Sequence, residues 1–165
     1  MGVSWDQIVA VFAAGALEGA GVPWPGAVVM AIAGIASDGN WQSIAILATL
    51  FSLAYCTGAL AQYLVGRLLG HVTLKWLSPQ RRKQLENMVH KHGTFAVLWT
   101  RPFAIGNYIS IPAGMMKMPL PRFLLYTFFG CWPWAFGVVY LGHYVGTEFA
   151  ITRSLAKQLT LPSVL

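Results

Sequence analysis

Charged residues are scarce in this 165-residue chain: Asp, Glu, Lys and Arg make up 10% of it, against about 25% in an average soluble domain. Acidic residues are the scarcest, with five in all. A hydrolase within a membrane would need a carboxylate pair or a Ser/His constellation, for which so few acids leave little material. The sequence also lacks a nucleophile elbow, a phosphate-binding loop and a zinc-protease motif. We therefore predict that the protein is not an enzyme.

Cysteine is equally scarce, and Cys56 and Cys131 lie singly within apolar runs. That setting favours buried, unreactive thiols over a disulfide. Neither the cysteines nor the four histidines have the spacing of metal ligands. The sequence thus predicts no metal site and no cofactor. The first residues carry no basic segment followed by a small-residue cleavage site, so we expect no cleavable signal peptide.

Apolar and aromatic residues, by contrast, are abundant. Hydrophobic residues make up 56% of the chain, and it contains seven Trp, nine Phe and six Tyr. Aromatic side chains of this kind anchor proteins at membrane interfaces. Since the long apolar runs must satisfy their own backbone within lipid, the sequence predicts an all-α integral membrane protein.

The basic residues gather in the middle of the chain, where six of the eleven Lys and Arg lie between Arg67 and Lys91. By the positive-inside rule, the loop 67–91 is expected in the cytoplasm, and its apolar flanks argue against a nucleic-acid partner. Ser78-Pro79 resembles the start of a helix. The basic amphipathic helix that follows has two equally supported places, on an anionic membrane surface or packed on its own protein.

The first half of the chain contains one broken and one continuous apolar segment. Residues 3–20 can form a helix, which Pro and Gly between Gly21 and Gly26 then interrupt. Residues 27–36 are apolar but too short to span a bilayer, so the pair is expected to form a re-entrant hairpin. After a turn, residues 41–70 are long enough to cross the membrane. The expected break residues of this hairpin are Pro23, Pro25 and Gly26.

The second half follows the same order. A broken segment, residues 94–117, precedes a span at residues 123–145 and a short tail at residues 150–165. We predict one membrane domain at residues 1–149, with repeat one at 3–70, a basic connector at 71–93 and repeat two at 94–149. The expected break residues of the second hairpin are Pro102, Gly106, Pro112 and Gly114.

Several residues of the first half have a counterpart in the second half. Each half has a charge near a proline break, an Ala-Gly pair and a span that ends in a tyrosine and a GxxxG sequence. One span per half, joined by a basic connector, makes the repeats inverted, and matching broken segments point to a binding site at the repeat interface. The first set is Glu18, Pro23, Ala33-Gly34, Tyr63 and Gly66 to Gly70, and the second is Arg101, Pro102, Ala113-Gly114, Tyr140 and Gly142 to Gly146.

Arg101 is the central candidate for ligand binding, because a charge in an apolar, broken segment is costly and usually functional. Its guanidinium can bind a phosphate through two donors, and Asn107, Tyr108 and Ser110 can complete a polar pocket. Glu18 is the second candidate, as a proton acceptor. Each has structural alternatives. Arg101 can snorkel to the interface, Glu18 can cap free backbone groups, or the two side chains can form an ion pair. Arg67 is expected to anchor the end of its helix at the interface.

Several of these motifs together resemble the DedA family, whose members are also called SNARE-associated or VTT-domain proteins. The resemblance runs from about Leu17 to Gly146. It rests on the PWPG stretch at residues 23–26, the Tyr63-x-x-Gly66-Arg67 sequence, the ISIPAG stretch at residues 109–114, and Gly142 with Gly146. It implies two facing re-entrant hairpins flanked by membrane helices, in the inner membrane. Ala27, Ala59 and Gly106 stand where the family often has charged residues, which leaves Glu18 and Arg101 as the main charged matches.

The family resemblance implies a lipid transporter or flippase for a phosphate-headed lipid, with undecaprenyl (polyprenyl) phosphate as the leading substrate. The alternatives are an uncoupled phospholipid scramblase, a proton-coupled ion or drug antiporter that uses Glu18, and a membrane scaffold that transports nothing. The partners implied are membrane lipid and, for a coupled mechanism, protons. Self-association into a homo-oligomer stays open.

Overall fold

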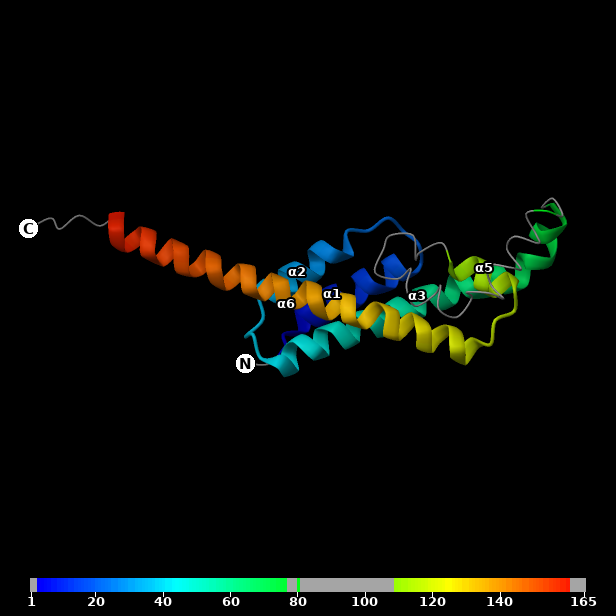
Figure 1. Ribbon diagram of the computed structural model, residues 1–165, viewed down its shortest axis with the longest axis horizontal. Coiled ribbons are helices and arrows are strands. Elements are labelled where there is room, and N and C mark those ends of the chain that lie inside the picture. The colour runs from blue at the N-terminus through cyan, green and yellow to red at the C-terminus, as the bar shows by residue number, and fades with distance from the viewer. Residues whose placement is uncertain (1–2, 77–79, 81–108, 161–165) are drawn as a thin grey trace, which may run out of the picture.

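A computed structural model describes residues 3–76, 80 and 109–160, and all regular structure in these ranges is helical. Figure 1 shows two long helices that cross, with shorter helices packed against them. The expectation of an all-α protein is therefore confirmed for the described residues. The helices are α1 (Trp5–Gly19), α2 (Gly26–Ile35), α3 (Trp41–Trp76), α5 (Ser110–Met115) and α6 (Leu120–Thr160).

Helix α1 begins and ends where its sequence dictates. Ser4 and Gln7 form a reciprocal capping box, in which the Gln7 N–H donates to Ser4 Oγ at 3.3 Å and the Ser4 N–H donates to Gln7 Oε1 at 2.9 Å. The helix ends at Gly19, and Gly21 follows with a φ of 82°, which a residue with a side chain rarely adopts. Pro23 and Pro25 then prevent continuation until α2 starts.

Within the described ranges, two segments are long and apolar enough to cross a membrane: Trp41–Gly70 in α3 and Leu120–Ala150 in α6. They run antiparallel. Trp41, at the start of α3, stacks on Tyr140 of α6 with ring centroids 5.8 Å apart, whereas Tyr63, near the other end of the span, stacks on Phe123 at 4.9 Å.

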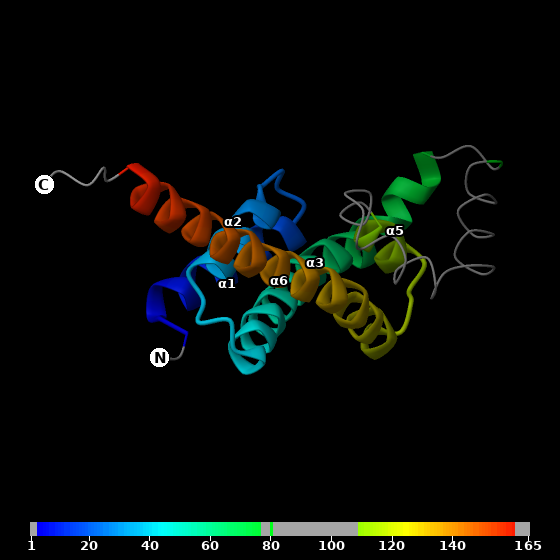
Figure 2. The ribbon, with the colours of Figure 1, turned by 60° about the vertical axis from the view of Figure 1, so that its left-hand side comes forward.

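The short helices each pack along one long helix, as both ribbon views show (Figures 1 and 2). Helix α1 follows α3, α2 follows α6, and α5 follows the second half of the α3 span. Glycine permits each approach. A Cβ at Gly15 of α1 would lie 2.6 Å from the Phe51 carbonyl oxygen, so only a hydrogen fits there.

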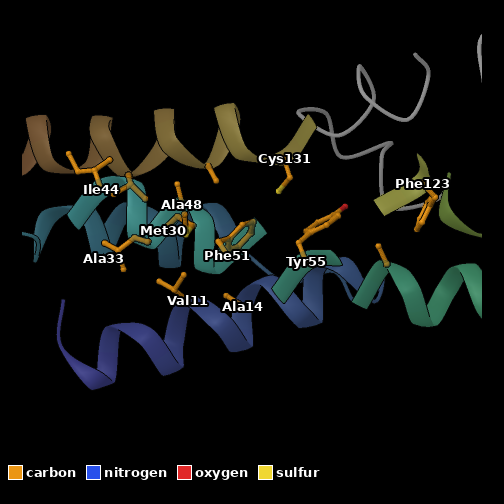
Figure 3. Close-up of a cluster of buried hydrophobic side chains, with 14 of the residues drawn as sticks. Val11, Ala14, Met30, Ala33, Ile44, Ala48, Phe51, Tyr55, Phe123 and Cys131 are labelled. Carbon is orange, nitrogen blue, oxygen red and sulfur yellow. The ribbon is translucent and has the colours of Figure 1, made fainter. Parts of the chain in front are cut away.

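The molecule is apolar outside as well as inside. Figure 3 shows Val11, Met30 and Phe51 in the cluster of buried side chains between the helices. Large apolar side chains also cover the surface, with Leu68 at 68% and Phe149 at 73% exposure. A contiguous apolar exterior of this kind suits lipid as the surrounding solvent. The buried polar side chains are Ser43, Ser52, Gln62, Ser110 and Thr127.

The first expected span matches the structure, and the second is longer than expected. The segment Pro119-Leu120-Pro121-Arg122 was expected to bound a span from residue 123, yet α6 begins at Leu120. Proline is tolerated there because the first-turn N–H groups have no partner within a helix. The helix also continues past residue 149 to Thr160, so no change of secondary structure marks the expected tail. The basic amphipathic helix of the connector lies outside the described residues.

Candidate functional site

The structure describes about half of the expected site. Glu18, Ser110 and the break residues Pro23, Pro25, Gly26, Pro112 and Gly114 lie within it. The residues outside the described ranges are Arg101, Asn107, Tyr108, Pro102 and Gly106. The geometry therefore concerns the first hairpin and the end of the second.

Glu18 lies in the last turn of α1, and its half-buried carboxylate folds toward the start of α2. Its Oε2 occupies the space that a Cβ of Gly26 would take. That oxygen is buried and has no hydrogen-bond partner among the residues that the structure describes. The break thus places an unpaired carboxylate oxygen beside the N-terminus of a helix, where the peptide dipoles favour negative charge.

Gln62 of α3 lies on the same break and was not expected from the sequence. It is 9% exposed, and its Nε2 donates to the Gly19 carbonyl at the end of α1 over 3.2 Å. Its Nε2 also fills the space beside the left-handed Gly21. The Oε1 is buried, and no described residue forms a hydrogen bond with it. The signal in the sequence was a carboxamide within an apolar stretch. In the fold, this side chain fixes the position of the break relative to α3.

The described part of the second hairpin is α5, which begins at the buried Ser110. Pro112 lies in its first turn, where the missing N–H is not needed. Gly114 packs directly on α3: a Cβ there would lie 2.9 Å from the Arg67 backbone nitrogen. The chain then turns at Lys117, which has a φ of 54°.

Tyr63 ties the end of α5 to α3. Its side chain is fully buried, and its hydroxyl donates to the Met118 carbonyl. The Arg67 guanidinium donates to the same hydroxyl oxygen at 2.9 Å. Arg67 is exposed at the end of the α3 span, as expected for an interface anchor, but it also supports this hydrogen bond.

We expect Tyr63→Phe to lower the free energy of unfolding by about 1–3 kcal/mol, because the Met118 carbonyl loses its donor and the Arg67 guanidinium its acceptor. Thermal unfolding of the purified protein in detergent measures the loss. Tyr144→Phe, on an exposed side chain of α6, is the matched control and should leave the transition unchanged. Equal shifts in the two variants would contradict the structural role of this hydroxyl.

Other polar contacts fix the helices rather than build a reactive centre. The Trp132 indole N–H donates to Thr49 Oγ1 at 3.1 Å between α6 and α3. Cys56 makes a weak contact with the Leu124 carbonyl at 3.9 Å, and Cys131 is buried, in line with packed thiols. Within the described ranges, no three His, Cys, Asp or Glu side chains gather as metal ligands would.

Comparison with known proteins places these features in a family. Residues 24–144 match the VTT domain, a stretch that includes the end of the hairpin break, α2, α3, the ISIPAG sequence and the first 25 residues of α6. The chain belongs to the VTT-domain, or DedA, family. The family resemblance of the motifs is thereby confirmed, and with it the identification as a membrane protein.

Three curated relatives illustrate the family. The chain is 32% identical to the uncharacterized membrane protein YkoX of Bacillus subtilis over 84% of its own length and 66% of that protein. It is 33% identical to undecaprenyl phosphate transporter A of the same organism over 47% of the chain and 39% of the relative. It is 30% identical to an alkaline phosphatase-like protein of Lactococcus lactis subsp. lactis over 81% of the chain and 68% of the relative.

The chain thus spans about two thirds or less of the first relatives' length. One of these relatives is named a transporter, and another carries the name of an enzyme. No solved structure shows significant similarity to the chain.

Proposed function

We propose that the protein is a lipid transporter that moves a phosphate-headed lipid across the membrane, with undecaprenyl (polyprenyl) phosphate as the first candidate. The observation that carries the proposal is the break between α1 and α2, a non-helical segment beside the two spans of a chain whose exterior is apolar; the phosphate itself is assigned to Arg101, not to Glu18. A broken helix with exposed backbone groups and a buried charge suits a lipid headgroup site. The relative named undecaprenyl phosphate transporter A supports the substrate class.

Two re-entrant hairpins are part of this proposal. Helices α1 and α2 have 15 and 10 residues, about 22 and 15 Å of helix, which is short of a bilayer core of about 30 Å. Helix α1 runs in the same direction as α3, and α2 runs in the same direction as α6. The long helices α3 and α6 are antiparallel to each other. The Gln7 side chain of α1 donates to the Ala33 carbonyl of α2 at 3.4 Å, which brings the outer ends of the two together. These contacts support a hairpin that enters and leaves on one side.

Inverted repeats are supported by the way the short helices are exchanged between halves. Helix α2 of the first half packs on α6, and α5 of the second half packs on α3. In both cases an Ala-Gly pair meets the GxxxG end of the other half's span. The contacts are Gly34 with Val139, Gly142 with Ala31 and Gly146 with Ile35 in one case, and Gly114 with Tyr63, Gly66 with Ile111 and Gly70 with Met115 in the other.

This register changes one detail of the expected repeat. Tyr63 precedes its GxxxG by three residues and takes the place that Val139, not Tyr140, takes on α6. By these contacts, Tyr63 corresponds to Val139, the residue before Tyr140. The glycine positions, where two backbones are in contact, match between the two halves, whereas the positions of the tyrosines do not.

In the proposed mechanism, Arg101 binds the phosphate through its planar fork, and Asn107, Tyr108 and Ser110 add polar contacts. Free N–H groups at the hairpin breaks add donors to the anionic head. The tail stays in lipid along the exposed apolar faces of α3 and α6. Rocking of the two halves about the site would expose the headgroup to either side.

Reconstitution in liposomes tests the proposal. Polyprenyl phosphate is placed in one leaflet, and its appearance in the other is followed with a reagent that reaches only that side. We expect flipping above the protein-free rate for polyprenyl phosphate and little acceleration for phosphatidylcholine. Equal acceleration of both lipids would replace the proposal with an uncoupled phospholipid scramblase, and no acceleration of either would favour a scaffold.

A proton-coupled antiporter is the second candidate, favoured by the buried, unpaired Oε2 of Glu18. We expect Glu18→Gln to abolish any acceleration of transport by an imposed pH gradient, because the carboxamide cannot exchange a proton. Transport with and without the gradient, in parent and variant, measures this. Glu148→Gln, on the exposed end of α6, is the matched control. Gradient-dependent transport that survives Glu18→Gln would exclude Glu18 as the coupling residue.

The proposed setting is the cell (inner) membrane, crossed several times, with the basic loop 67–91 in the cytoplasm. Arg67 at the end of one span and Arg122 at the start of the other lie at the same end of the antiparallel pair, and Lys117 lies on the turn between α5 and α6, before Arg122. Cations at one end support that orientation. A homo-oligomer stays compatible with the exposed apolar faces.

A further inference from the structure

A cavity and a groove lie at the end of the molecule opposite Arg67, and neither belongs to the site at the break. The cavity, of about 390 Å³, is lined where α1 and α3 begin and α2 ends. The groove, of about 350 Å³, runs between α1 and α2. Gln7 and Ala36 line both spaces, so the two are adjacent. Each lies within the size range of ligand pockets, about 300–1,000 Å³.

The two spaces differ in chemistry. The cavity carries hydroxyl, amide and carboxylate groups, from Ser4, Gln7, Ser37, Asp38 and Ser43. The groove is apolar except at one edge, where Asp6 and Gln7 lie, and its walls are Ala10, Val29, Ile32 and Ala33. A polar pocket beside an apolar groove matches the head and tail of an amphiphile.

Membrane depth agrees with this division. The cavity lies beside Trp5 and Trp41, the exposed aromatic residues that open α1 and α3, at 80% and 64% exposure. Tryptophan gathers at headgroup level. The groove extends from there along α1 and α2, toward the hydrocarbon. Asp6 and Glu18 are separated by twelve residues of helix, about 18 Å, so this region is distinct from the break.

The charge of the site selects among lipid heads. Asp38 is exposed, and the Ser43 side chain and the Asn40 N–H (3.2 Å away) donate hydrogen bonds to it. These bonds hold the pKa of the Asp38 carboxyl below its usual value, so it is ionised. Asp6 adds a second negative charge, and the C-terminal end of α2 adds partial negative charge. Of the described residues that line either space, none is basic.

We propose that this cavity and groove bind one phospholipid whose headgroup carries a primary ammonium, of the phosphatidylethanolamine class, as a bound lipid rather than as cargo. The ammonium donates to the Asp38 carboxylate, the hydroxyl of Ser4, which otherwise accepts from the Gln7 N–H, donates to the lipid phosphate, and one acyl chain lies along Val29 and Ile32. A phosphate-only head would be repelled by two carboxylates, Asp38 and Asp6, so we do not expect the proposed transport substrate at this site.

Native mass spectrometry of the full chain, released from nanodiscs of phosphatidylethanolamine, phosphatidylcholine or phosphatidylglycerol, tests the proposal. We expect the parent to retain one phosphatidylethanolamine about tenfold more often than phosphatidylcholine, since a charge-assisted hydrogen bond is lost with the quaternary ammonium. Asp38→Asn should abolish that preference, and Ala36→Trp, which fills the junction of the two spaces, should lower retention of every lipid. Glu148→Gln removes the same charge elsewhere and should retain the parent's preference.

Equal retention of phosphatidylglycerol, or an unchanged preference in Asp38→Asn, would overturn the site. A lipid-free dimer released from all three nanodiscs would also overturn it, because a second copy would then fill the groove. Should Asp38→Asn unfold, Ala36→Trp alone decides, and unchanged retention there counts against the site. Flipping of polyprenyl phosphate by Asp38→Asn is measured in parallel and should persist, so failure here and failure of the proposed transport are told apart.

Discussion

Gly34→Ala and Gly114→Ala are each expected to destabilise the fold by about 3 kcal/mol, at the upper end of the effect of overpacking. At Gly34 the Val139 carbonyl, and at Gly114 the Tyr63 carbonyl, already occupy the space of a Cβ. The obstruction is backbone, which cannot rotate away as the end of a side chain can. The methyl group must therefore push α2 from α6, or α5 from α3.

Gly137→Ala on α6 is the control, because nothing lies within 4 Å of a Cβ at that position. Alanine is the better helix former by about 0.8–1 kcal/mol, so this variant should be slightly more stable than the parent. Thermal unfolding in detergent, followed by tryptophan fluorescence, measures all three variants. If Gly34→Ala and Gly114→Ala unfold at the temperature of Gly137→Ala, the close packing of the short helices on the spans is wrong.

Arg101→Ala is expected to lower flipping of polyprenyl phosphate by about a hundredfold, the size of effect seen when a donor to a developing or buried anion is removed. Arg101→Lys should restore only part of the rate, since an ammonium keeps the charge but not the two-donor fork. The initial rate in liposomes measures both.

Arg122→Ala provides the matched control for Arg101, because it removes the same charge from an exposed position at the start of α6. Its flipping rate should stay within about twofold of the parent, as expected for an exposed charge that contacts no substrate. Unfolding temperatures of the three arginine variants separate loss of binding from loss of fold. A rate for Arg101→Ala equal to that of Arg122→Ala would remove Arg101 from the proposed site.

The α3 span and the Ala-Gly pairs show how much of the fold can be predicted from sequence pattern. The span 41–70 was expected and found, because thirty apolar residues without proline have few alternatives to a helix in lipid. The pairing of Ala33-Gly34 with Ala113-Gly114 was also visible as a repeat. The pattern does not predict, however, that each Ala-Gly pair packs on the span of the other half. That arrangement depends on how the chain folds back on itself.

Gln62 shows the opposite case, a residue with no motif whose importance comes from its neighbours. Its carboxamide donates a hydrogen bond to the Gly19 carbonyl, forty-three residues earlier in the chain. The same group fills the space beside Gly21. A carboxamide in an apolar run predicts a polar contact but not its partner. Likewise, α6 can start at Leu120 because a helix tolerates proline in its first turn. From the sequence alone, the prolines in this segment predicted a boundary before the helix.

By itself, the sequence determined the membrane class, the family, the first span and the break that follows Glu18, because composition, length and proline positions act locally. Only the tertiary structure decided which helix each short segment contacts, where the Glu18 carboxylate points, and that a polar cavity adjoins an apolar groove beside Asp38. Those features depend on backbone approach between segments distant in sequence, which glycine permits but does not direct.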